Sequence, residues 1–167
     1  MKKVIKNYLA KLQENDKKGF SLVELIIVMA IMAILVGIVA SQVLPYMEKS
    51  RQSKDQQVIS GYCTDLVSAI AQSTNPVGDI AGQDITTLTG ATGDPAAVKD
   101  FAATFVGLQN DTPITTNSLK AKLKSKEASK GNYTVKFDYS SVTGKVKVYI
   151  DGHGDGKSGD KMYVESN

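Results

Sequence analysis

One apolar stretch near the start of the chain limits what the protein can be. From Leu25 to Ala40, sixteen consecutive residues carry neither a charge nor a strongly polar side chain, and counted from Phe20 the run reaches twenty-one residues. A helix of about this length crosses the hydrocarbon core of a bilayer. The sequence therefore predicts a membrane-spanning helix over residues 20–44, but Glu24 places a carboxylate inside it.

Three interpretations of this stretch compete. A secretory signal peptide would have the basic start, an apolar middle and small residues near Ala40 and Ser41, but its apolar part is usually shorter and lacks a carboxylate. A plain signal anchor would hold a soluble domain at the outer face of the membrane. The third interpretation has to explain Gly19, Phe20 and Glu24 together.

Glu24 is costly in a bilayer unless it lies near the segment's end or has a partner. If the chain is cut after Gly19, Phe20 gains a new α-amino group and Glu24 falls in the first helical turn. The positive end of the helix dipole favours a carboxylate there. Glu24 would then either simply stabilise the helix start or meet the terminal amine of a neighbouring chain.

These residues resemble a known motif. The stretch KKGFSLVELIIVMAIMAIL is similar to the cleavage and methylation motif of type IV pilins and type II secretion pseudopilins. The resemblance implies that a prepilin peptidase cuts after Gly19 and N-methylates Phe20, and that Glu24 pairs with the terminal amine of an adjacent subunit. It covers roughly residues 17–50. The 19-residue leader is long for the commonest pilin subclass, although Phe20 is that subclass's usual first residue.

The remaining composition argues against catalysis and nucleic-acid binding. Residues 1–19 hold six lysines against two acids, so the chain after Gly19 carries a net charge of −1 although the whole is +3. A nearly neutral mature part gives no case for a nucleic-acid partner. The chain has one cysteine, Cys63, and one histidine, His153, which lies in a glycine-rich loop with nothing obvious to orient it. We therefore expect no enzyme, no cofactor, no disulfide and a core role for Cys63.

The sequence predicts three parts: a leader over residues 1–19, the apolar helix over 20–44, and an amphipathic helix half with a head domain over 45–167. The long helix is expected to pass Gly37 and Pro45, with a mild kink or a stretch that melts in a filament, and to end near Ser73. Its second half has one apolar face, formed by Val58, Ile59, Tyr62, Cys63, Leu66, Val67 and Ile70.

The C-terminal part predicts an α+β arrangement, which agrees with the pilin fold that the resemblance implies. Residues 74–94 are expected to form a loop. Asp94-Pro95 is expected to start a short helix, and its buried side consists of Val98, Phe101, Ala102 and Phe105. Residues 118–131 are expected to form another helix with a solvated lysine surface. Alternation over 133–139 and 146–150 predicts a hairpin, and residues 162–165 a third strand.

The loop DGHGDGKSGD, residues 151–160, superficially resembles a calcium loop. It fails the EF-hand spacing because His153 stands at the third position and Met162 where the bidentate glutamate belongs. A different oxygen cage from Asp151, Asp155 and Asp160 stays open, but we expect no metal site and a flexible connection between strands.

These expectations combine into a structural role. The chain is expected to wait in the cytoplasmic membrane as a single-pass protein and to polymerise into an extracellular helical pilus that supports adhesion, twitching motility or biofilm formation. Its partners would be copies of itself, the membrane, the prepilin peptidase and the assembly machinery. The alternatives are a pseudopilin of a type II secretion or DNA-uptake system and a membrane-anchored adhesin that never polymerises.

Overall fold

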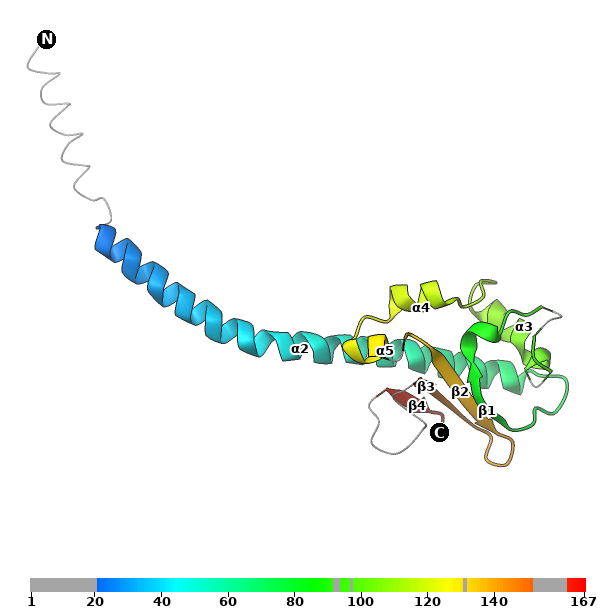
Figure 1. The fold of residues 1–167 in the computed structure, drawn as a ribbon. Helices are drawn as coiled ribbons and strands as arrows, with labels where there is room; N and C mark the ends of the chain where they lie inside the picture. The colour runs from blue at the N-terminus through cyan, green and yellow to red at the C-terminus, as the bar shows by residue number, and fades with distance from the viewer. Residues whose placement is uncertain (1–20, 92–93, 97, 131, 152–161) are drawn as a thin grey trace, which may run out of the picture. The chain divides into compact units, whose positions relative to one another are not determined.

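The computed structural model describes residues 21–167 except 92–93, 97, 131 and 152–161, and it divides the chain into two compact units. The first unit runs to Pro45, and the second, here called the head domain, spans Tyr46–Asn167. Elements from α2 through α5 precede the C-terminal strands in the chain (Figure 1). The α+β fold class is therefore confirmed.

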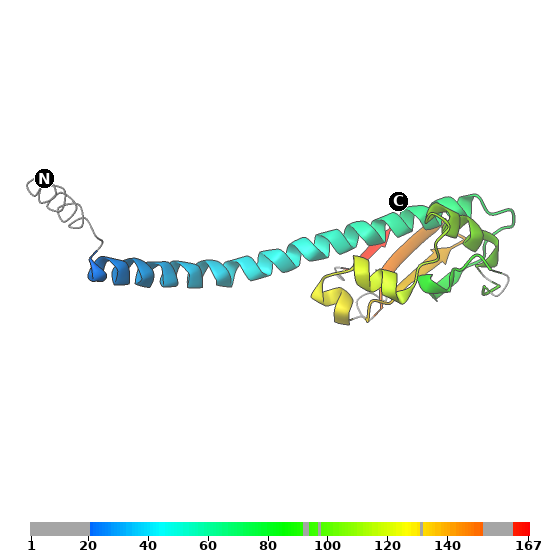
Figure 2. The same ribbon diagram turned by 90° about the horizontal axis from the view of Figure 1, so that it is seen from above.

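Helix α2 (Leu22–Ala71) is a single element of 50 residues that passes through both Gly37 and Pro45. It ends two residues before the expected boundary, and the amides of Gln72 and Ser73 bond back to Ser68 and Ile70. In the head domain its buried residues are Asp55, Ile59, Tyr62, Cys63, Leu66 and Ala69. These positions lie on one face of the helix, and the apolar ones among them belong to the core between the helix and the sheet (Figure 2).

The sheet has four antiparallel strands in the order β1-β2-β3-β4, formed by β1 (Ile80–Asp84), β2 (Val135–Ser140), β3 (Lys145–Ile150) and β4 (Tyr163–Glu165). The expected hairpin is confirmed, with Val135 opposite Ile150 and Ser140 opposite Lys145. Val135 and Phe137 of β2 and Val146, Val148 and Ile150 of β3 are buried, as their alternation predicts.

The prediction of a loop over residues 74–94 is wrong between residues 80 and 87. This stretch forms β1 and the short 3-10 helix η2 (Ile85–Thr87), anchored by buried Ile80 and Ile85. A bulge between Ile80 and Gln83 and a positive φ of 64° at Gly82 interrupt the two-residue period. Pairing with β2 makes the strand, and that contact is not visible in the local sequence.

The expected start of the next helix at Asp94-Pro95 is also wrong. Helix α3 (Lys99–Leu108) begins four residues after Pro95, with Val98 at its N-cap. Asp94 instead closes the preceding loop, because its carboxylate accepts the amide of Thr89 at 3.1 Å and that of Gly90 at 2.8 Å. The buried side of α3 is as predicted, with Val98, Phe101, Ala102 and Phe105 inaccessible to solvent.

The single helix expected over residues 118–131 is two shorter helices, α4 (Thr116–Lys122) and α5 (Lys126–Lys130). Thr115 and Ser118 form a reciprocal capping box at the start of α4. The break follows from Asp55 on α2, whose carboxylate accepts the amides of Lys124 and Ser125, each at 2.9 Å. These amides would otherwise belong to a continuous helix.

The core of the head domain is self-contained. Its buried side chains come from α2, η2, α3, α4, α5 and the sheet, and Phe101 meets Phe137 edge to face with ring centroids 6.2 Å apart. Among the described residues, no side chain before Val58 belongs to this cluster or packs against it. The head domain therefore draws nothing in its core from the first unit.

Candidate processing and assembly site

The residues that the sequence singles out lie at the start of α2. Gly19 and Phe20 fall outside the described residues, so their roles in cleavage and methylation stay predictions. Glu24 is described, and it lies in the first turn of α2, where its side chain is exposed. The first helical turn is where the positive end of the helix dipole stabilises a carboxylate.

Glu24 caps its own helix. The amide of Ser21 donates to Glu24 Oε2 at 3.1 Å, and the amide of Leu25 donates to the Ser21 carbonyl at 3.1 Å. Ser21 thus stands at the N-cap position and Glu24 at the third helical position, where glutamate satisfies a backbone donor that would otherwise lack a partner. The sequence carries the signal for this contact, Ser-x-x-Glu, as SLVE at residues 21–24, although the surrounding apolar run draws attention to membrane insertion instead.

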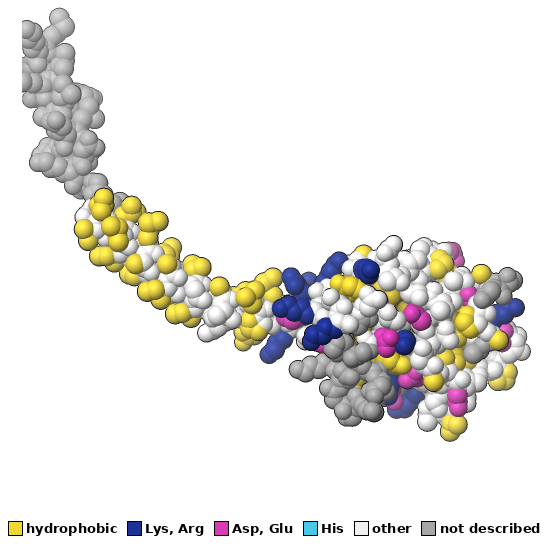
Figure 3. Space-filling view, viewed as in Figure 1, with side chains coloured by type: hydrophobic (Ala, Val, Ile, Leu, Met, Phe, Trp, Pro, Cys, Tyr) yellow, Lys and Arg dark blue, Asp and Glu magenta, His cyan; other side chains and the backbone are white. Residues whose placement is uncertain are grey.

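The helix that follows is apolar on all sides and uncovered. Sixteen large apolar side chains between Leu22 and Leu44 are exposed, from 44% for Val43 to 73% for Leu22. Figure 3 shows hydrophobic side chains along the visible face of this segment. By length and composition it is the one helix among the described residues that could cross a membrane. An apolar surface of this extent needs a lipid or protein environment.

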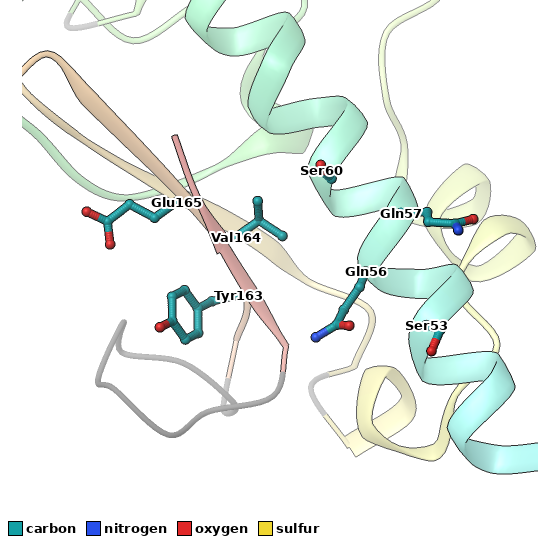
Figure 4. A pocket seen from close by; sticks show the side chains of 7 residues that line it. All are labelled: Ser53, Gln56, Gln57, Ser60, Tyr163, Val164 and Glu165. Atoms are coloured by element: carbon teal, nitrogen blue, oxygen red, sulfur yellow. The ribbon is translucent and has the colours of Figure 1, made fainter. Parts of the chain in front are cut away.

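The head domain also contains an open groove. It lies between α2 and β4 and is lined by Ser53, Gln56, Gln57, Ser60, Tyr163, Val164 and Glu165 (Figure 4). Its carboxylate, Glu165, lies 3.6 Å from the ammonium of Lys145 and 4.0 Å from that of Lys147. Among the described residues that line it, the groove therefore presents amides and hydroxyls but no nucleophile paired with a base.

Cys63 is a core residue of the head domain. Its side chain is 3% exposed, and its thiol donates to the Val146 carbonyl at 3.6 Å. Burial and the nearby charge of Glu165 raise the pKa of this thiol, while a hydrogen bond from the Ser166 backbone opposes them. The thiol is therefore held protonated, which is the unreactive form.

The possible calcium cage is only partly described. Asp151 forms a salt bridge with Lys136, with 3.0 Å between Oδ2 and Nζ. Asp155 and Asp160, like His153, lie outside the described residues. Within the described part of the chain, no group of three or more His, Cys, Asp or Glu side chains is close enough to hold a metal ion.

Comparison with known proteins bears on the N-terminal segment. A family model for the prokaryotic N-terminal methylation motif matches residues 15–40, a range that includes Gly19, Phe20, Glu24 and the apolar run. No curated protein and no solved structure matches the chain. The motif points to a structural subunit that is anchored in a membrane, rather than to an enzyme. The chain carries, at residues 15–40, the N-terminal methylation motif that is the hallmark of type IV pilins and pseudopilins.

Proposed function

We propose that the chain is the structural subunit of a type IV pilus that supports surface adhesion, twitching motility or biofilm formation. A prepilin peptidase cuts between Gly19 and Phe20 and methylates Phe20. Residues 20–44 then hold the subunit in the cytoplasmic membrane until the assembly machinery adds it to the filament. The observation that carries this proposal is an uncovered apolar helix that begins, inside the methylation motif, with the carboxylate of Glu24.

The apolar helix explains why a membrane and a filament core are equivalent surroundings for it. Burying one large apolar side chain is worth about 1.5–3 kcal/mol, so sixteen of them represent tens of kcal/mol. Exposure of this surface to water is therefore excluded at each stage. Movement from lipid into a bundle of identical helices keeps the surface covered. The hydrophobic effect then does not determine the stagger, which is the axial offset between neighbouring helices.

A charged pair can choose the stagger. The amine of Phe20 on one subunit and the carboxylate of Glu24 on its neighbour meet in a low-dielectric core, where a charge without a partner is expensive. Glu24 would then serve two donors, the Ser21 amide of its own chain and the neighbour's amine. A carboxylate has two oxygens with about four acceptor sites, so the two contacts are compatible.

Substitutions at Glu24 separate capping from pairing. Glutamine at the third helical position still accepts the Ser21 amide but carries no charge, whereas valine does neither. If pairing sets the stagger, Glu24→Gln and Glu24→Val both give mature, membrane-held subunit and little sheared filament. Glu24→Asp keeps the charge with a shorter reach and gives an intermediate amount. Immunoblots of membrane and sheared fractions measure this, from cells that express each variant alone.

Two controls accompany this series. Gly19→Val should leave the leader attached, because a side chain at that position obstructs the peptidase. For the wild-type chain, the intact mass should show that the protein begins at Phe20 and carries one added methyl group. Normal filament yield from Glu24→Gln with loss in Glu24→Val would show that the cap, and not the charge, is what assembly needs. Normal yield from Glu24→Val would contradict both roles, and a wild type without long filaments would favour the pseudopilin or the adhesin.

A further inference from the structure

Several exposed cations lie together at the start of the head domain. Six exposed residues form this basic collar: Lys49, Arg51 and Lys54 on α2, and Lys124, Lys126 and Lys130 on or beside α5. The two groups are about 75 residues apart in sequence. The amide of Lys126 donates to Glu48 Oε1 at 2.6 Å, and Asp55 binds the amides of Lys124 and Ser125, so α5 is fixed beside the first turns of α2 in the head domain. Figure 3 shows dark blue side chains gathered in this region.

The collar is not neutralised by its own acids. Glu48, Asp55 and Glu127 lie among the six cations, but Asp55 is 0% exposed and occupied by backbone amides. Arg51 lies 4.0 Å from Glu48 and Lys130 lies 3.1 Å from Glu127. The ammonium groups of the four other lysines are beyond salt-bridge distance of every described acid. The collar therefore presents a net positive surface to a partner.

The collar begins where the apolar run ends. Leu44 is the last residue of the predicted membrane-spanning segment. At 1.5 Å per helical residue, Glu48 follows about 6 Å later and Asp55 about 16 Å later. The polar headgroup layer of a bilayer is about 5–8 Å thick on each side, and charges act over a further 8–10 Å at physiological salt. Tyr46 is 72% exposed, and the Lys49 ammonium lies 5.9 Å from its ring centroid. Tyrosine at this depth is typical of a membrane interface.

We propose that the basic collar binds anionic phospholipid headgroups at the membrane surface from which the head domain emerges. The proposal rests on membrane anchoring of the subunit and does not require that the subunit form filaments. Phosphate-bearing lipid is favoured over nucleic acid because the α2 part of the collar directly follows, along the chain, the segment that could span a bilayer. Tyr46, which is exposed beside the collar, lies on its side toward the apolar segment rather than among the lysines of α5, where bases would stack.

The test uses the head domain, residues 46–167, because its core contains no residue from the first unit. Sedimentation with vesicles of phosphatidylglycerol and of phosphatidylcholine at low salt measures partition. Each cation near an anionic surface contributes about five-fold to binding, so Lys54→Gln with Lys126→Gln should lower the partition to phosphatidylglycerol about 30-fold. Neither ammonium is within salt-bridge distance of a described acid, so the head domain should melt as the wild type does.

The control is Lys99→Gln with Lys145→Gln, which removes the same charge from exposed positions outside the collar. Lys145 pairs with Glu165, which keeps Lys147 as its partner in this variant. The control should change the partition by no more than a few-fold. Equal losses in the two double variants, or equal binding of the wild type to both lipids, would overturn the proposal. Binding to a DNA duplex without binding to phosphatidylglycerol vesicles would overturn it in favour of a nucleic-acid surface. The Glu24 series reports on filaments independently of all these outcomes.

Discussion

Two carboxylates on the same helix have opposite environments and different tasks. Glu24 is exposed and satisfies the amide of Ser21 at the helix start, whereas Asp55 is 0% exposed and satisfies two amides of the α4–α5 connection. Asp55 lies four residues before Ile59, on the same face of the helix. The pattern of apolar residues alone would place this aspartate on the solvent-exposed side of the helix. Nothing in the neighbouring sequence reveals the two amides that donate to it, which lie 69 and 70 residues later in the chain.

Removal of the Asp55 carboxylate should destabilise the head domain. Asp55→Ala leaves the amides of Lys124 and Ser125 without their acceptor, at a cost of about 1–3 kcal/mol for each buried donor. We expect a loss of about 2–4 kcal/mol in the free energy of unfolding, measured by urea denaturation. Asp65→Ala on the same helix is the control, because Asp65 accepts from the Gln109 side chain, which water can satisfy instead. Similar losses in both variants would show that Asp55 does not fix the connection.

At the scale of elements, the β2–β3 hairpin could be predicted and β1 could not. Apolar and polar residues alternate on both strands of the hairpin, and the turn between the strands is short. The polarity of each residue therefore indicates which face of the sheet it occupies. Strand β1 has five residues, a bulge and a glycine at φ 64°, and it owes its pairing to β2, more than 50 residues away. The break between α4 and α5 was missed for the same reason, because Asp55 meets the amides that cause it 69 and 70 residues later. The start of α3 was misplaced because Asp94 closes a loop onto Thr89 and Gly90 and does not cap a helix.

The bend in β1 depends on Gly82. Its positive φ costs an ordinary L-residue about 1–2 kcal/mol, although the space around a Cβ is sufficient, with the Tyr149 hydroxyl 3.8 Å away. Gly82→Ala should therefore lower the free energy of unfolding of the head domain by about 1–2 kcal/mol. Gly78→Ala, just before the strand, has open space and no positive φ, so it should be neutral or stabilising by up to about 1 kcal/mol. Chemical denaturation of both variants makes the comparison; an unchanged Gly82→Ala would mean that β1 can straighten.

At the scale of the whole molecule, the two units differ in how far the sequence alone predicts them. The first unit was predictable from sequence, because its length, apolarity and motif are local properties that require no partner inside the chain. In the head domain the α+β class, the hairpin and the buried side of α3 were predictable. Its connections were not, because they depend on contacts between distant residues. The division at residues 1–19, 20–44 and 45–167 stays a prediction, although the structure separates its own two units next to Pro45.

Independence of the head domain can be measured directly. Residues 46–167 alone should melt cooperatively, and within about 3 °C of the same domain in the detergent-solubilised mature chain, because the described core begins at Val58. Calorimetry or near-ultraviolet circular dichroism would record both transitions. The same measurement with calcium and with chelator should give equal midpoints if the loop at residues 151–160 holds no metal tightly. A head domain that fails to melt cooperatively without residues 20–45 would contradict the division.

The passage of α2 through Pro45 has a mechanical consequence. Proline has no amide hydrogen, so the carbonyl of Ser41, four residues earlier, lacks its helical donor, and this turn has one cross-link fewer than its neighbours. A subunit pulled along its axis within a fibre would carry the load through the backbone of α2. We expect extension to begin at this turn, while the folded head, whose core starts thirteen residues later, keeps its shape. If the proposed filament forms, it would then lengthen under load and shorten again when the load is removed. The extension would occur at one turn of α2 in each subunit.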